Sequence, residues 1–178
     1  MFTNVKLNIN FDQFTKADYS MHEGSCIKHQ VTELTDIHTQ YGGFPDSIVY
    51  ENTKINQLWW DNSSVDFDNI GDQLGMDVVT VSSIRQPAGC IIPLHRDIFF
   101  QVKKAFPDRP GPHVRANIFL EDYRMGHFLQ YINEQEQYVT ATNWKAGDGF
   151  LWDSKPLHLS ANAGFEFKYT LQISGFLR

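Results

Sequence analysis

The chain has 178 residues, of which 42% are hydrophobic and 20% are charged. This composition is typical of a single soluble globular domain. Its formal charge of -6 argues against a nucleic-acid-binding protein, because such proteins need a basic surface. Two cysteines are too few for a disulfide framework or a four-cysteine zinc site, so we expect free thiols at Cys26 and Cys90.

The sequence shows no targeting or membrane segment. Its first residues lack a basic stretch followed by an apolar one, which is the pattern of a secretory signal. No apolar run approaches the roughly 20 residues that a membrane-spanning helix needs. We therefore expect a cytoplasmic protein that has no membrane partner.

The first 75 residues mix helix and strand signals. Residues 4–11 alternate between apolar and polar as a strand does. Residues 63–75 begin with serines, carry early acidic residues and end at a glycine, which predicts a helix with a serine cap. We expect residues 1–75 to form a mixed α/β region that flanks the core.

From residue 76 onward the sequence predicts one strand after another. The segments are short, rich in β-branched and aromatic residues, and separated by Gly, Pro, Asp or Asn. They span 77–85, 90–95, 113–121, 126–134, 136–144, 149–154, 156–162 and 167–177. This series predicts a mainly β sandwich or barrel over residues 76–178, within one domain of residues 1–178. The stretch 103–112, rich in Pro, Lys and Arg, is expected to be an exposed, mobile loop.

Three of the predicted strands carry a polar row opposite an apolar row. The polar rows are Arg115 and Asn117; His158, Ser160 and Asn162; and Lys168, Thr170, Gln172 and Ser174. Such rows usually face water. Here each row includes a side chain able to bind a metal or a carboxylate, so we interpret the rows as lining a polar interior.

His95 and Asp97 follow an apolar run that Pro93 is expected to end. At positions i and i+2 of an extended chain their side chains point to the same side, so both can bind one ion. Two histidines and one carboxylate form the facial triad of non-haem Fe(II) oxygenases, which leaves other metal positions open. A third ligand must therefore come from another segment.

His158 is the preferred third ligand, because a proline precedes its strand and polar residues share its face. His113, in the proline-rich loop, is expected to be a solvated loop residue. His127 begins a strand and could line the same cavity. His22, His29 and His38 are further candidates in the N-terminal region.

Lys168 and Thr170 suggest a second ligand beside the metal. An Fe(II) oxygenase that uses 2-oxoglutarate must hold the distal carboxylate of this diacid with a fixed cation. Lys168 lies ten residues after His158, and Thr170 shares its strand face. A cation and a hydroxyl on one face can bind one carboxylate, although the same lysine on an edge strand would simply face solvent.

In this order, His95-x-Asp97, His158 and Lys168-x-Thr170 resemble the Fe(II)/2-oxoglutarate-dependent oxygenase superfamily. Residues 115–175 are similar to its aspartyl/asparaginyl β-hydroxylase-like group, through "VRANIFLED", "GHFLQYIN" and "NWKAGDGFLWDSKPLHLSAN". The resemblance implies a double-stranded β-helix, which is a cupin-like jelly roll, with a few flanking helices. It also implies Fe(II) held by His95, Asp97 and His158, with 2-oxoglutarate as co-substrate.

The resemblance further implies that Arg115 and Ser83 help to bind 2-oxoglutarate beside Lys168 and Thr170. The group usually carries arginine where this chain has Lys168. A single ammonium charge therefore replaces a guanidinium group that could form two hydrogen bonds to the carboxylate. Asp97 supplies the carboxylate ligand that some members lack, and its presence argues against a halogenase.

The implied activity is hydroxylation of an unactivated C–H bond in an amino acid, a peptide or a related small molecule, with release of succinate and CO2. Trp59 and Trp60 could form an aromatic wall of the substrate site, or could pack in the core. Arg85 and Arg124 could meet a substrate carboxylate. The alternative is a cupin-like metal-binding protein or a metalloenzyme that does not use 2-oxoglutarate.

Overall fold

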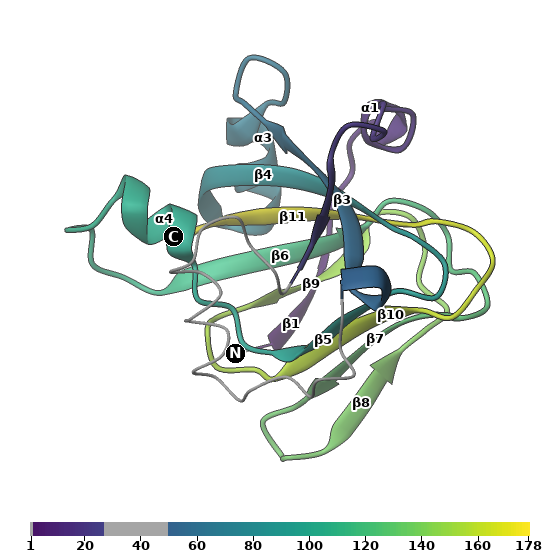
Figure 1. Ribbon diagram of the computed structural model, residues 1–178. Helices are drawn as coiled ribbons and strands as arrows, with labels where there is room; N and C mark the ends of the chain where they lie inside the picture. The colour runs from purple at the N-terminus through teal and green to yellow at the C-terminus, as the bar shows by residue number, and fades with distance from the viewer. Residues whose placement is uncertain (1, 27–49) are drawn as a thin grey trace.

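The computed structural model describes residues 2–26 and 50–178 as two antiparallel β-sheets that face one another (Figure 1). In spatial order, the seven-stranded sheet comprises β1 (Phe2–Lys6), β9 (Asp148–Trp152), β6 (His113–Phe119), β11 (Lys168–Leu177), β4 (Met76–Gln86), β3 (Lys54–Trp60) and β2 (Glu23–Ser25). The four-stranded sheet comprises β5 (Ile91–His95), β10 (His158–Asn162), β7 (His127–Ile132) and β8 (Tyr138–Ala141). The prediction of a mainly β, cupin-like jelly roll is therefore confirmed.

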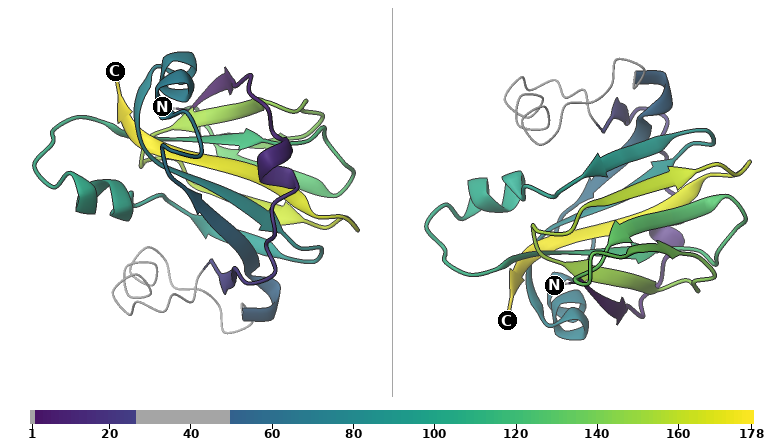
Figure 2. Two further views of the ribbon diagram at one scale, coloured as in Figure 1. Left: turned by 90° about the horizontal axis from the view of Figure 1, so that it is seen from above. Right: turned by 90° about the horizontal axis from the view of Figure 1, so that it is seen from below.

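The helices are short and lie outside the two sheets (Figure 2). They are α1 (Asp12–Thr15), a 3-10 turn η1 (Tyr50–Asn52), α3 (Phe67–Leu74) and α4 (Phe100–Ala105). The predicted helix over 63–75 is α3, but Asp66 and not a serine caps it, accepting a hydrogen bond from the Asn69 N–H. Among the described residues, no helix has the length and apolar character needed to cross a membrane.

The strands of the first 75 residues extend the core sheet at both edges. β1 pairs with β9, and β3 pairs with β4 while β2 pairs with β3. The region predicted only to flank the core thus supplies three of the seven strands of one sheet. A strand with one free edge and one apolar face gains hydrogen bonds and buries that face by joining an existing sheet.

The largest hydrophobic cluster lies on the outer face of the seven-stranded sheet. The apolar rows of β4, β6 and β11 pack there against Leu7, Phe14 and the buried side of α3. Their polar rows therefore face the space between the two sheets, as the alternation in the sequence predicted. The interior of the jelly roll is consequently the polar side of these strands.

One local prediction is wrong, and a second is correct only in part. Pro93 does not end the apolar run but lies buried inside β5. Its missing N–H is tolerated because β5 is an edge strand of its sheet. The stretch 103–112 is exposed as predicted, but its first three residues form the last turn of α4. Val102 is buried against Phe99 and Phe176 and anchors that helix.

Candidate metal centre

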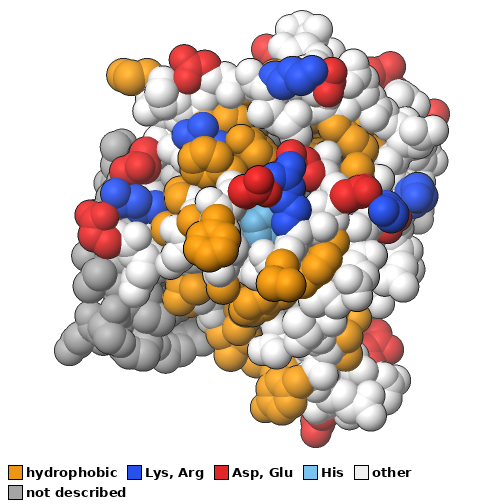
Figure 3. Space-filling view, turned by 90° about the vertical axis from the view of Figure 1, so that its right-hand side faces the viewer, with side chains coloured by type: hydrophobic (Ala, Val, Ile, Leu, Met, Phe, Trp, Pro, Cys, Tyr) orange, Lys and Arg blue, Asp and Glu red, His pale blue; other side chains and the backbone are white. Residues whose placement is uncertain are grey.

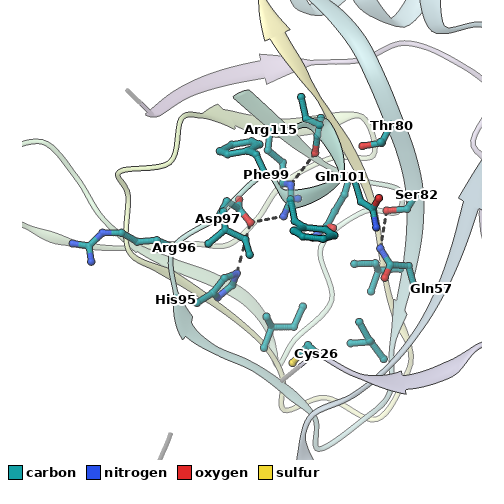
Figure 4. A pocket seen from close by; sticks show the side chains of 18 of the residues that line it. Cys26, Gln57, Thr80, Ser82, His95, Arg96, Asp97, Phe99, Gln101 and Arg115 are labelled. Atoms are coloured by element: carbon teal, nitrogen blue, oxygen red, sulfur yellow. Dashed lines mark hydrogen bonds and ion pairs between the residues drawn. The ribbon is translucent and has the colours of Figure 1, made fainter. Parts of the chain in front are cut away.

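Three side chains converge at one end of the space between the sheets. His95 ends β5 and His158 begins β10, and the two residues are directly paired across these strands. Asp97 follows β5, and one ligand atom from each of the three residues lies within 4.8 Å of the other two. The structure thus brings together the three residues that the sequence predicted as metal ligands; Figure 4 shows His95 and Asp97 at the cavity wall.

The turn after Asp97 places α4 beside the metal residues. Phe99 has a left-handed backbone with φ 54° and ψ 36°, a conformation that is uncommon for a bulky residue and is held only where the surroundings enforce it. Its side chain is buried against Val102 and Phe176. This turn directs the chain into α4, so that Phe100 and Gln101 line the cavity beside the metal residues.

Backbone carbonyl groups fix the orientation of both imidazoles. Nδ1 of His95 lies 2.7 Å from the Pro93 carbonyl oxygen, and Nδ1 of His158 lies 3.1 Å from the Pro156 carbonyl oxygen. A neutral ring that donates from Nδ1 keeps its Nε2 lone pair for a metal. Both Nε2 atoms face Asp97, at 4.0 Å from Oδ1 for His95 and 3.8 Å from Oδ2 for His158.

Both carboxylate oxygens of Asp97 are oriented by protein donors. Trp152 Nε1 donates to Oδ2 at 2.5 Å, and Arg115 Nη1 donates to Oδ1. Burial alone would raise the pKa of Asp97, but the Arg115 guanidinium, the two imidazoles and the Trp152 N–H together lower that pKa to about 2. Asp97 is therefore an anion at every physiological pH, as a metal ligand must be.

Burial also keeps the two imidazoles neutral. Desolvation, reinforced by His158, lowers the pKa of His95 to about 4, and desolvation lowers the pKa of His158 as well. A metal ligand must be deprotonated, so the folded chain prepares its three ligands without a metal present. Two neutral imidazoles and one carboxylate fit a divalent transition metal, Fe(II) among them.

Lys168 is a buried basic side chain in the space between the sheets. Its side chain is buried, and Nζ donates to Ser160 Oγ at 2.6 Å and to the Phe128 carbonyl oxygen at 2.7 Å. Desolvation lowers its pKa to about 7. No carboxylate pairs with it in the part of the chain that the structure describes. A buried amine without an anion fits a dicarboxylate ligand, which would supply the missing charge.

The spacing between the metal residues and Lys168 suits a short diacid. Ser160, which contacts Lys168 Nζ, lies two residues beyond His158 on β10 and on the same face. At about 3.3 Å per residue this places the two positions about 7 Å apart, comparable to the length of an extended five-carbon dicarboxylate. Thr170 lies two residues beyond Lys168 on β11 and faces the same interior. The donor set therefore fits 2-oxoglutarate.

A cavity of about 330 Å³ opens beside His95 and Asp97 (Figure 4). Its walls come from the inner faces of β3, β4 and β11, from β5 and from α4. The polar lining includes Gln57, Thr80, Ser82, Gln101, Arg115, Gln172 and Ser174. This is the space through which a substrate would reach the metal.

The proposed co-substrate residues do not all lie in one place. Arg115 lines the cavity, but it pairs with Asp97 and donates from Nε to Ser174 Oγ at 3.0 Å. Ser83 is not brought to the site. It faces the outer side of β4, where its hydroxyl contacts Tyr19 OH at 2.7 Å and Trp60 Nε1 at 2.9 Å. Its neighbour Ser82 lines the cavity instead.

Of the four proposed substrate residues, Trp59 alone lines the cavity, with 56% of its surface exposed. Trp60 lies on the opposite face of β3, and Arg85 stacks on Phe167 with its guanidinium carbon 4.3 Å from the ring centroid. Arg124 forms an ion-pair cluster with Glu121 and Glu166.

Arg124 belongs to the turn between β6 and β7, and this turn lies at the opposite end of the sheets from α4 (Figure 1). Figure 3 shows the surface at that end, where charged side chains lie among hydrophobic ones. The exposed hydrophobic residues Met125, Phe165 and Phe167 belong to the turns of this end. Arg124 is therefore remote from the cavity that His95 and Asp97 line.

The other histidines of the described ranges do not join the metal residues. His113 stacks against Phe99 and Phe176, and the Nε2 atom of the buried His127 lies 3.3 Å from the Glu166 carbonyl oxygen. His22 is exposed. His29 and His38 lie outside the described residues.

Sequence reasoning missed two residues that support the site. Trp152 orients Asp97, and Ser160 links Lys168 to Gln86 by donating to Gln86 Oε1 at 3.0 Å. The alternation of β9 carried a signal for Trp152, since it shares a face with Phe150 and pairs with Arg115. Ser160 was recognised as part of a polar row, but its bond to Lys168 depends on tertiary packing.

We expect the metal-free protein to lose stability as the pH falls from 6.5 to about 4. His95 and His127 both have a pKa of about 4 in the folded chain, lowered mainly by desolvation, against about 6.5 when unfolded. In this window the unfolded chain binds protons that the folded chain does not, so the free energy of unfolding rises with pH. For His95, whose side chain is 17% exposed, each tenfold change in proton affinity between the two states corresponds to at most about 1.4 kcal/mol.

Urea unfolding between pH 7.5 and 4.5 in the presence of a chelator measures this effect. A His95→Gln/His127→Gln double variant should show a smaller dependence of the unfolding free energy on pH. A wild-type midpoint that stays constant over this range would contradict the assignment of two neutral buried imidazoles.

No model of a protein family and no curated protein matches the sequence. Among solved structures, a prolyl-4-hydroxylase from Pseudomonas putida superposes with a TM-score of 0.51 at 18% identity, covering 70% of this chain and 72% of that one. The epimerase SnoN, in a complex with Fe3+, alpha ketoglutarate and nogalamycin RO, superposes with a TM-score of 0.50 at 13% identity. That match covers 69% of this chain and 63% of SnoN, less than two thirds of it. At these identities the likeness shows a shared fold.

Proposed function

We propose that the chain is an Fe(II)- and 2-oxoglutarate-dependent dioxygenase that hydroxylates an unactivated C–H bond. The observation that carries this proposal is the combination of a preformed His95, Asp97 and His158 triad with a buried Lys168. No carboxylate of the described residues neutralises Lys168, and it contacts Ser160, two residues beyond His158. The fold is shared with a prolyl-4-hydroxylase and with an epimerase that binds alpha ketoglutarate, which supports the proposal.

The chemistry that Fe(II) and 2-oxoglutarate supply when bound is the reduction of O2, with one oxygen atom entering a C–H bond and the other leaving in succinate as CO2 is released. The protein residues would hold and orient these groups. His95, His158 and Asp97 would hold the metal, and Arg115 and Trp152 fix the carboxylate of Asp97. No side chain needs to act as a general acid or base.

Lys168 and Thr170 would hold the distal carboxylate of 2-oxoglutarate, with Ser160 positioning the Lys168 ammonium. Arg115 remains a proposed co-substrate residue through its place beside Asp97. The buried surroundings strengthen a charge-assisted hydrogen bond and exclude water from the reacting centre. Ser83 is not included, because its hydroxyl faces the outer side of β4.

We further propose that the chain belongs to the aspartyl/asparaginyl β-hydroxylase-like group, on the strength of its motifs over 115–175. The substrate would be an amino acid, a peptide or a related small molecule. It would enter the cavity past Trp59, the one proposed substrate residue that lines it.

The test is formation of succinate from 2-oxoglutarate by protein reconstituted anaerobically with Fe(II) and then exposed to O2. We expect slow succinate formation without substrate and a faster rate when a substrate is present, with mass spectrometry showing one atom from ¹⁸O2 in the product. A parallel sample reconstituted with Zn(II) should produce none. If succinate formation does not depend on Fe(II), the alternative of a cupin-like protein that does not use 2-oxoglutarate is favoured.

A further inference from the structure

A band of uncharged polar side chains crosses the inner face of the large sheet. Asn117 on β6 is paired in register with Gln172 on β11, and Gln172 is paired with Ser82 on β4. Gln57 on β3 joins the band by donating from Nε2 to Ser82 Oγ at 2.9 Å. All of these residues except Asn117 line the cavity beside the metal residues, and Figure 4 shows Gln57 and Ser82 in contact there.

Much of the hydrogen-bonding capacity of this band is unused. Asn117 is 7% exposed, and its Oδ1 atom is buried with no hydrogen-bond partner among the described residues. The side chain of Gln172 likewise makes no hydrogen bond within the described ranges 2–26 and 50–178. Buried polar groups are almost always paired in folded proteins, so the unpaired Asn117 oxygen is unusual. Its register partner Gln172 is half-buried and lines the cavity, so the Gln172 carboxamide can pair with a ligand there.

The charges around the cavity are already neutralised or directed elsewhere. Arg115 pairs with Asp97. Arg96 donates from Nε to the Lys155 carbonyl oxygen at 2.9 Å, and Figure 4 shows its side chain pointing away from the cavity. Among the described lining residues, none offers a free carboxylate or ammonium group to a ligand. A charged group buried here would lack a partner, which is costly.

We infer that the substrate presents to this cavity an uncharged group that carries adjacent hydrogen-bond donors and acceptors, as a capped amide or a peptide bond does, and not a free zwitterionic amino acid. A carboxamide side chain has a donor and an acceptor side by side, so it can form two hydrogen bonds with a primary amide or with the N–H and C=O groups of one residue in an extended peptide. Trp59 and Phe100 add aromatic walls for the apolar part of such a compound. The inference rests on the proposed function, because it treats the cavity as the substrate site of that enzyme.

Matched compounds test the inference. The Fe(II)- and 2-oxoglutarate-loaded protein is titrated anaerobically with N-acetyl-leucinamide and N-acetyl-glutaminamide, and with free leucine and glutamine, following tryptophan fluorescence. We expect each capped amide to bind at least about tenfold more tightly than its free amino acid, which corresponds to about 1.4 kcal/mol. Equal or tighter binding of the free amino acids, or no binding of either capped amide, overturns the inference.

Charge-changing variants of the band provide the second measurement. Gln172→Glu and Gln57→Glu should each weaken binding of the capped amides about tenfold or more, while the affinity for 2-oxoglutarate stays unchanged. Gln135→Glu, in the exposed turn between β7 and β8, is the matched control and should alter neither affinity. If Gln172→Glu instead lowers the affinity for 2-oxoglutarate alone, the band belongs to the co-substrate site and the inference fails.

The proposed function is tested separately in the same samples. Absence of 2-oxoglutarate binding to the wild-type, Fe(II)-loaded protein would refute the proposed dioxygenase, whatever the capped amides do. Binding of 2-oxoglutarate without any preference for the capped amides would refute the substrate class and leave the dioxygenase intact. The two failures therefore have different signatures.

Discussion

Replacing His158 with alanine should remove the bound Fe(II) and reduce succinate formation to the level of the metal-free protein. His158 and His95 are paired across β5 and β10, so losing either imidazole leaves two ligands on one ion. Loss of an outer hydrogen bond to a metal ligand already costs about 10- to 100-fold in metal affinity. Loss of the ligand itself should cost more, and His95→Ala should behave in the same way.

Metal content after dialysis, and the visible spectrum of the Co(II)-substituted protein, measure this effect independently of turnover. His22→Ala is the matched control, because His22 is exposed and lies outside the triad. The fold should survive in the His158→Ala variant, since the hydrophobic core lies on the other side of the large sheet. A His158→Ala protein that retains one equivalent of metal with wild-type affinity would disprove the proposed centre.

Replacing Lys168 with methionine should weaken the binding of 2-oxoglutarate by about 100-fold or more while Fe(II) still binds. A buried charge-assisted hydrogen bond to a carboxylate contributes about 1.5–3 kcal/mol, and the distal carboxylate of the ligand would also lose the cation proposed to hold it. The methionine side chain retains most of the volume of the lysine stem. Isothermal titration with 2-oxoglutarate gives the affinity, and Lys145→Met, at an exposed ion pair with Asp122, is the control.

The same titration should also reveal the uptake of a proton when 2-oxoglutarate binds. Desolvation lowers the pKa of Lys168 to about 7, so at pH 8 most of the protein holds a neutral amine. A bound carboxylate favours the ammonium form and raises this pKa. Binding of 2-oxoglutarate at pH 8 should therefore take up a proton, seen as a binding enthalpy that depends on the ionisation enthalpy of the buffer. The Lys168→Met protein should show no uptake; an equal uptake would assign the proton to another group.

Local spacing was enough to predict that the three candidate metal ligands come together. His95 and Asp97 are two residues apart, so their shared direction follows from local geometry. His158 and Lys168 could be placed because each belongs to a row in which polar and apolar residues alternate. The few residues on either side of each of these positions are enough to predict the direction of its side chain.

Residues could not be assigned to a face of the sheet in strands where polar and apolar residues do not alternate. In β4 the two faces carry Thr80 and Ser82 on one side and Val81 and Ser83 on the other, so the sequence does not reveal which serine faces inward. Trp59 and Trp60 are equally ambiguous, and only the pairing of β3 with β4 decides between them. Arg115 was placed on the correct face, but its pairing with Asp97 depends on how β6 packs beside the turn after β5.

The two faces of the large sheet have different roles, one in folding and one in lining the cavity. Its apolar rows pack against α3 and the N-terminal segment, while its inner rows carry the polar groups of the cavity. Mutations of the polar residues in the inner rows consequently leave the largest hydrophobic cluster untouched. Such a scaffold can accumulate changes in ligand preference at little cost in folding, so that lineages carrying it can diverge in chemistry while their architecture stays the same.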